Sequence, residues 1–190
     1  MKTAKREKLV TFFLYLVFAF YLLLLFLILF RQRHSVRSFN LVPFRGIFSY
    51  LTGIDLISGT EDPAFLRGFA LSNLLGNIVI FIPLGVYFTL LNPKKGIWRN
   101  TLLVMAVSAA VEMVQFAFQL GIGDVDDVIL NGIGGLLGVL LCKGLYRLCK
   151  EDEAGVRRAV AIFAPIAGVL SFAILILQNY GSVFLNFIFK

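Results

Sequence analysis

Residues 9–30 have the sequence LVTFFLYLVFAFYLLLLFLILF and contain no charged side chain. About 20 helical residues cross a hydrocarbon core roughly 30 Å thick, so this stretch predicts a transmembrane helix. Basic residues precede it within positions 1–8, as they do in a signal peptide. However, the apolar run is longer than in a signal peptide, and Arg31 and Arg33 follow it where small cleavage-site residues are expected. The sequence therefore predicts a helix that is retained in the membrane.

The composition excludes several classes of protein. The 190 residues are 59% hydrophobic and 15% charged, and they include 20 Phe. A soluble domain is about half apolar and about a quarter charged, so a soluble enzyme and a disordered chain are both excluded. The two cysteines, Cys142 and Cys149, are too far apart along a helix for a mutual disulfide. The net charge of +7 does not indicate a nucleic-acid partner, because in a membrane protein the positions of the charges matter more than their sum.

Four further apolar stretches, at residues 71–91, 101–120, 128–148 and 159–178, predict additional membrane spans. The fold class expected is all-α: a polytopic transmembrane helix bundle with about five spans. Residues 31–70 follow the first helix, are partly apolar and are interrupted by proline and glycine. We expect this segment to be external and either interfacial or re-entrant, in contact with membrane lipids.

The distribution of basic residues predicts the orientation. If the amino terminus is in the cytoplasm, most of the 18 Lys and Arg residues lie on the cytoplasmic side of the membrane, as the positive-inside rule requires. The interpretation is a multi-pass protein of the bacterial cytoplasmic membrane, with its amino terminus inside and its carboxyl terminus outside. Residues 1–8 then form a cytoplasmic basic tail, 9–148 the membrane domain, 149–158 a cytoplasmic loop, and 159–190 the fifth span with an external tail.

Two of the predicted spans contain polar residues with helical spacing. Asn73 and Asn77 share one face of the second span, and Ser108, Glu112 and Gln115 form a stripe on the third. Such groups are costly in hydrocarbon and usually face a bundle interior or a wet cavity. The two amides can equally be interhelical hydrogen-bond partners without further function. The carboxyl group can serve as a general acid or base, or as the structural partner of an external arginine.

The strongest pattern is GDVDDVILNGIGGLLG at residues 123–138. If a helix begins near Asp124, then Asp127, Asn131 and two of the glycines lie along one face, where glycine permits close packing. This phase is the sole reason to prefer Asp124 to Asp126 as a site residue. Capping of the helix start explains one of the acidic residues equally well. Oxygen ligands suit Mg²⁺ or Ca²⁺, but the spacing does not match an EF-hand, so we expect no metal and no other cofactor.

The external segment contributes NLVPFR at residues 40–45. Asn40 is a candidate hydrogen-bonding residue. Arg45 stands beside an apolar stretch, and an arginine fork binds phosphate in a bidentate manner. The alternative for Arg45 is a structural ion pair with one of the carboxylates.

Four segments in this order, NLVPF at 40–44, NLLGNIVIFIPLG at 73–85, SAAVEMVQ at 108–115 and the acidic, glycine-rich run at 124–138, resemble the VanZ-like family of small membrane proteins. The resemblance implies a link to the cell envelope and to tolerance of glycopeptide antibiotics, teicoplanin in particular. It supplies no set of catalytic residues.

The preferred function is the binding or shielding of an amphipathic cell-envelope ligand in an outward-facing polar pocket. The ligand is a lipoglycopeptide antibiotic or a lipid-linked cell-wall precursor, with Arg45 holding an anionic group. The other candidate ligand-binding residues are Asn40, Asn73, Asn77, Ser108, Gln115, Asp124 and Asn131. The alternative is a membrane-embedded hydrolase or transferase with Glu112 or Asp127 as general base. The absence of GxSxG, HExxH and Cys/His patterns makes the enzyme the weaker hypothesis.

Overall fold

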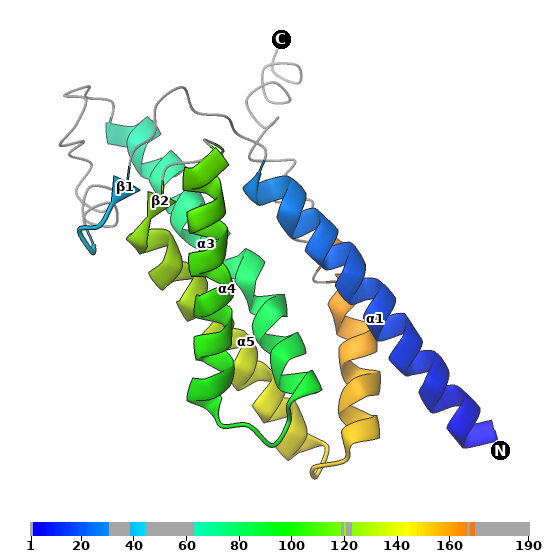
Figure 1. Ribbon diagram of the computed structural model, residues 1–190. Coiled ribbons are helices and arrows are strands. Elements are labelled where there is room, and N and C mark those ends of the chain that lie inside the picture. The colour runs from blue at the N-terminus through cyan, green and yellow to red at the C-terminus, as the bar shows by residue number, and fades with distance from the viewer. Residues whose placement is uncertain are drawn as a thin grey trace.

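The computed structural model describes residues 2–30, 39–44, 63–118, 120, 123–166 and 168–169, with the side chains of residues 2, 3, 39 and 63–73 left undescribed (Figure 1). Its elements are α1 (Lys2–Leu29), β1 (Phe39–Asn40), α3 (Pro63–Leu91), α4 (Ile97–Phe118), β2 (Gly123–Asp124) and α5 (Val125–Leu148). Residues 153–166 are also helical, and they lie beside α1. The prediction of an all-α fold is confirmed.

Four of these helices are long and apolar enough to span a membrane. The spans are Ala4–Leu29, Leu74–Leu91, Ile97–Phe118 and Val125–Leu148. The chain is therefore a multi-pass membrane protein. The predicted fifth span extends beyond the described residues, and residues 45–62 of the predicted interfacial or re-entrant segment lie outside them as well.

The helices begin earlier than the apolar stretches that predicted them. The stretches starting at 71, 101 and 128 belong to helices that begin at Pro63, Ile97 and Val125. Hydropathy marks only the part of a helix that suits hydrocarbon, whereas backbone hydrogen bonding continues through polar residues. Proline is well tolerated at the first position of α3, because that N–H has no partner within the helix.

The backbones of α3 and α5 pack against each other through glycines. A Cβ at Gly134 would collide with the backbone carbonyl of Ile78, and a Cβ at Gly138 with that of Ile82. On α3, a Cβ at Gly85 would collide with the backbone of α5 in the same way. Association of helices in lipid depends on close van der Waals packing, and small residues permit it. The predicted glycine face of α5 is thus the face on which α3 packs.

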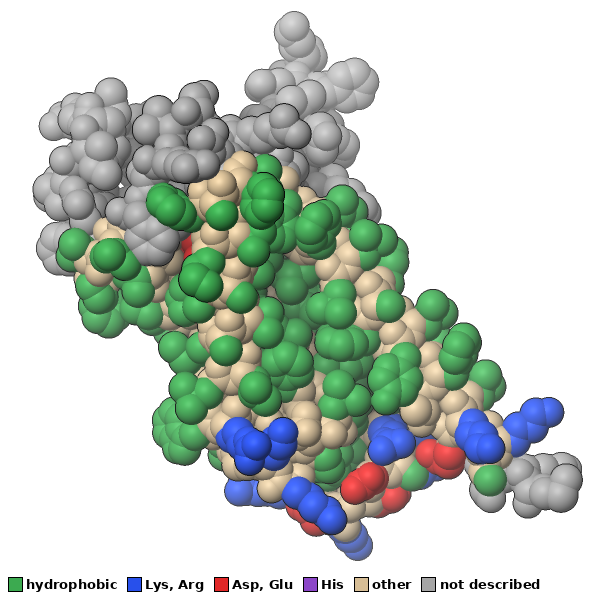
Figure 2. Space-filling view, viewed as in Figure 1, with side chains coloured by type: hydrophobic (Ala, Val, Ile, Leu, Met, Phe, Trp, Pro, Cys, Tyr) green, Lys and Arg blue, Asp and Glu red, His purple; other side chains and the backbone are tan. Residues whose placement is uncertain are grey.

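Helix α1 contacts α3 along one side and leaves its other side uncovered. The Tyr21 hydroxyl donates a 2.7 Å hydrogen bond to the Ile80 carbonyl, and the Phe18 ring stacks on Tyr87 with 4.3 Å between the ring centroids. Large apolar side chains elsewhere on α1, such as Phe12, are exposed. Hydrophobic side chains cover the sides of the bundle in Figure 2, as expected for surfaces that face lipid.

Among the described residues, Lys and Arg side chains gather at one end of the bundle (Figure 2). The start of α1, the α3–α4 turn at residues 92–96 and the turn at 149–152 lie at one end, and the β1–β2 pair lies at the other (Figure 1). Lysine and arginine side chains gather at the first of these ends in Figure 2. We call it the basic end (residues 2–8, 92–99 and 143–158) and the opposite one the strand end (β1, β2 and the adjoining helix termini).

The glycine contact predicts a specific loss of stability. Gly138→Ala places a Cβ against the Ile82 carbonyl, so α3 and α5 must separate. We expect a destabilisation of about 1–3 kcal/mol, measured by thermal unfolding of detergent-purified protein through the fluorescence of the single tryptophan, Trp98.

Gly144→Ala on the same helix is the matched control. Its Cβ would meet nothing within 4 Å, and replacing a helix-interior glycine by alanine favours the helix. We expect this variant to unfold at the wild-type temperature or slightly above it. Equal unfolding temperatures for the two variants would show that the α3–α5 contact is not a constraint on the fold.

Candidate functional site

The strand end is held together by a short parallel pairing between distant parts of the chain. Phe39 pairs with Gly123, and Asn40 pairs with Asp124. The Asn40 side chain reinforces this pairing, because its Nδ2 donates a 3.1 Å hydrogen bond to Asp124 Oδ1. Its Oδ1 accepts the Val42 N–H at 3.2 Å. Asn40 therefore joins the segment after α1 to the start of α5.

Asp124 begins α5 and contacts α4. It is the N-cap residue, with φ −128° and ψ 123°, and its Oδ1 accepts the Asp126 N–H at 2.9 Å. Aspartate is favoured at this position because its side chain accepts a backbone N–H that has no partner within the helix. The backbone N–H of Asp124 donates to Glu112 Oε2 at 3.0 Å. The buried carboxylate of α4 thus fixes the start of α5.

Asp126 was missed as a site residue, because the helical phase favoured Asp124. Its side chain is only 2% exposed, and Oδ1 accepts the Phe44 N–H at 2.5 Å. Phe44 has a φ of 66°, a left-handed conformation that is unfavourable for a residue other than glycine. The hydrogen bond from Phe44 thus explains why Asp126, a second acidic residue in the first turn of α5, is buried.

Two further polar pairs connect α5 to its neighbours. Asn77 Nδ2 of α3 donates to Asp127 Oδ1 at 2.5 Å, and Asn131 Nδ2 donates to Ser108 Oγ of α4 at 2.8 Å. Asn131 is 2% exposed, and its Oδ1 accepts no hydrogen bond from any described residue. One buried acceptor is therefore left without a partner from the described part of the chain.

The polar stripe predicted on α4 divides between two neighbours. Ser108 and Glu112 are buried and contact α5 and its N-cap. Gln115 instead donates through Nε2 to the Leu29 carbonyl at 2.7 Å, at the end of α1. The last carbonyls of a helix have no partner within it, so this bond satisfies one of them.

We call three hydrogen-bonded groups along α5 the polar cluster: Asn40 with Glu112, Asp124 and Asp126; Asn77 with Asp127; and Ser108 with Asn131. Gln115 is not included, because its hydrogen bond goes to α1. Two other predicted site residues cannot be placed: Arg45 lies outside the described residues, and the side chain of Asn73 is not described.

The polar cluster carries carboxylates without a described counter-charge. Among described residues, the ion pairs involve Arg157 and Arg158 at the basic end, and none involves Glu112, Asp124 or Asp127. Among the same residues, no three His, Cys, Asp or Glu side chains are grouped so that they could hold a metal ion. Chemically, the cluster offers hydrogen-bond acceptors, which suit a partner that carries N–H, O–H or ammonium donors.

An open apolar cavity of about 1260 Å³ lies between α1, α3, α5 and the helical residues 153–166 and 168–169. Side chains that line it include Phe20, Ile28, Ile80 and Leu137, and Gly144 leaves space on the α5 side. Ile80 lies three residues after Asn77, which is less than one helical turn. The apolar cavity therefore reaches within one turn of the polar cluster along α3.

Comparison with known proteins gives a family. The family model described as VanZ/LLP1 matches residues 12–149. Protein VanZ of Enterococcus faecium is 29% identical over 126 residues, which cover 62% of this chain. The match spans 65% of the length of that relative, and no solved structure matches the chain. Because the family match covers residues 12–149, more than half of the 190-residue chain, the chain belongs to the VanZ/LLP1 family.

Proposed function

We propose that this protein binds and shields an amphipathic cell-envelope ligand, and thereby contributes to resistance to glycopeptides such as teicoplanin. The polar head of the ligand contacts the polar cluster, and its acyl or prenyl tail lies in the apolar cavity. The observation that carries this proposal is the short distance along α3 between a buried set of acceptors and a cavity of about 1260 Å³.

The charge of the polar cluster favours one class of ligand. Carboxylates attract donors and cations, and they repel a phosphate unless cations compensate. A lipoglycopeptide presents peptide N–H groups and sugar hydroxyls, which are donors. A lipid-linked phosphate precursor would need a cation such as Arg45, which lies outside the described residues. The described charges therefore favour the lipoglycopeptide.

The charge at the two ends supports an outward-facing site. Cytoplasmic segments of membrane proteins are enriched in Lys and Arg, and these gather at the basic end (Figure 2). With the basic end in the cytoplasm, the strand end faces the outside, where envelope ligands are found. The amino terminus is then on the cytoplasmic side of the bacterial membrane.

The enzyme alternative uses the same carboxylates. Both of its candidate bases already accept hydrogen bonds within the protein, Glu112 from the Asp124 N–H and Asp127 from the Asn77 amide. These bonds give each carboxylate a structural role in joining α5 to α4 and α3. Catalysis would require one of these carboxylates to act as a base in addition to this structural role, whereas binding does not. The described geometry therefore favours binding.

The apolar cavity predicts an effect of filling it. A Gly144→Phe side chain would enter the cavity without a backbone clash, because a Cβ at Gly144 meets nothing within 4 Å. Each buried CH₂ contributes about 0.8 kcal/mol, so exclusion of an acyl tail weakens binding by roughly tenfold or more. We expect this loss for teicoplanin, measured as Kd by thermophoresis with purified protein in nanodiscs.

Gly96→Phe is the control, because Gly96 also has open space around it and does not line the apolar cavity. We expect it to bind teicoplanin like the wild type and to preserve resistance in cells that express it. A glycopeptide without an acyl chain should bind weakly to all three proteins. Unchanged teicoplanin affinity in a folded Gly144→Phe variant would exclude the apolar cavity as the tail site.

Glu112→Gln separates binding from catalysis. Glutamine still offers an oxygen to the Asp124 N–H, so the fold is expected to persist. We expect the variant to lose less than tenfold in affinity for teicoplanin. We also expect teicoplanin that has been incubated with the wild-type protein to keep its mass, as measured by mass spectrometry. A mass change produced by the wild type and abolished by Glu112→Gln would instead establish the enzyme.

A further inference from the structure

A second pocket, of about 450 Å³, lies at the basic end, between α1, the α3–α4 turn and the helix at 153–166. Its wall is apolar and includes Leu14, Phe18 and Leu90. Its rim carries Lys94, Lys95, Arg157 and a single carboxylate, Glu153. We call it the basic pocket; it is separate from the polar cluster, which lies at the strand end.

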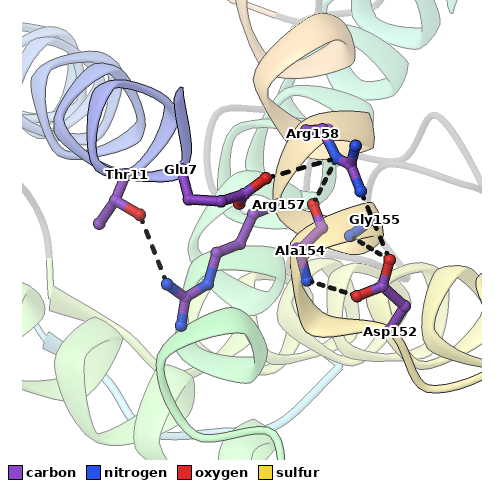
Figure 3. Close-up of polar contacts among 7 residues, drawn as sticks. All are labelled: Glu7, Thr11, Asp152, Ala154, Gly155, Arg157 and Arg158. Carbon is purple, nitrogen blue, oxygen red and sulfur yellow. Dashed lines mark hydrogen bonds and ion pairs between the residues drawn. The ribbon is translucent and has the colours of Figure 1, made fainter. Parts of the chain in front are cut away.

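The side of the basic pocket formed by α1 is fixed by three contacts. The Tyr87 hydroxyl donates to the Leu14 carbonyl at 3.2 Å, and the Tyr87 ring stacks on Phe18. Arg157 donates through Nη1 to Thr11 Oγ1 at 3.4 Å, as Figure 3 shows. The apolar wall is thus formed before any ligand binds, which is typical of small-molecule sites.

The turn that carries the two lysines is also held in place. Lys143 of α5 donates from Nζ to the Pro93 carbonyl at 2.6 Å. Lys94 and Lys95 follow directly, and among described residues neither takes part in an ion pair. Two ammonium groups are therefore positioned at the rim without a described counter-ion.

The nearby carboxylates are engaged with arginines. Arg158 lies between Glu7, at 3.9 Å, and Asp152, at 3.5 Å (Figure 3). Glu153 pairs with Arg157 at 3.5 Å. The carboxylates close to the basic pocket therefore pair with arginines and not with Lys94 or Lys95. These two lysines remain available to an anion.

The basic pocket lies at the level of the lipid headgroups. The span Leu74–Leu91 ends just before the lysine turn, and the span Ile97–Phe118 begins just after it. Trp98 beside the turn is 73% exposed, as is typical of a residue anchored at the membrane interface. A phosphate at the rim would be at headgroup depth, and an acyl chain on the wall would be in hydrocarbon.

We propose that the basic pocket binds one anionic phospholipid. Its phosphate contacts Lys94 and Lys95, and part of an acyl chain lies on the apolar wall. Lysine binds phosphate as a compact charge, and basic pockets between membrane helices bind anionic headgroups. The apolar wall favours a lipid over free phosphate, since inorganic phosphate gains nothing from it.

The test is a lipid titration of the full-length protein in nonionic detergent, followed by native mass spectrometry. We expect one phosphatidylglycerol adduct that forms at lower lipid concentration than a phosphatidylcholine adduct. Lys94→Gln/Lys95→Gln should raise the half-saturating phosphatidylglycerol concentration roughly tenfold and leave that of phosphatidylcholine unchanged.

Two further double variants control for net charge and for folding. Lys5→Gln/Lys8→Gln removes the same charge from exposed positions at the same end, outside the basic pocket, and should change half-saturation less than twofold. Lys94→Arg/Lys95→Arg keeps the charge and should retain the adduct within about twofold.

Three results would overturn the proposal. The first is a wild-type protein with no preference for phosphatidylglycerol. The second is an equal loss in both glutamine variants, which would indicate a diffuse charge effect. The third is displacement of the adduct by an equal concentration of inorganic phosphate, which would indicate a site for the free anion. None of these outcomes bears on the polar cluster, so the proposed function is tested separately.

Discussion

The close approach of the α3 and α5 backbones is the constraint on which the other contacts depend. Gly134 and Gly138 face α3 carbonyls with no room for a Cβ. Hydrocarbon gives two apolar helices little reason to associate, so contact at this range supplies the stabilising packing. It also sets the distance at which Asn77 reaches Asp127, because Asn77 directly precedes Ile78, whose carbonyl lies against Gly134. Larger residues at these positions would separate the two helices and thereby also separate Asn77 from Asp127.

Burial of polar groups in this bundle follows from the same geometry. Asn131 and Ser108 pair between α5 and α4, where Gly135 lies against the Val104 side chain. A polar group in hydrocarbon is costly without a hydrogen bond, and the pairs avoid this cost while they fix the register of neighbouring helices. Asn131 Oδ1 is an exception among the described residues, and Asn131 lies about one helical turn after Asp127 on α5.

Among the described residues, the two ends of the bundle carry different polar groups. At the strand end, Glu112, Asp124 and Asp127 provide acceptors, while at the basic end Lys94 and Lys95 provide cations. A donor-rich head and an anionic headgroup are the complementary ligands.

The sequence by itself determined the four described spans, because hydropathy is summed over about 20 neighbouring residues and needs no tertiary contact. It also determined the face of α5 on which Asp127, Gly134 and Gly138 lie, because helical periodicity is local. It did not mark the true starts of α3, α4 and α5, since polar residues continue a helix beyond the hydrocarbon.

Only the tertiary structure decided which polar groups meet. Asn40 pairs with Asp124 although 84 positions separate them, and Gln115 contacts α1 instead of joining the stripe to which its spacing assigns it. Such pairings depend on the rotation of each helix about its axis and on how closely neighbours approach. Those quantities are set by packing between segments, and no pattern within one segment contains them.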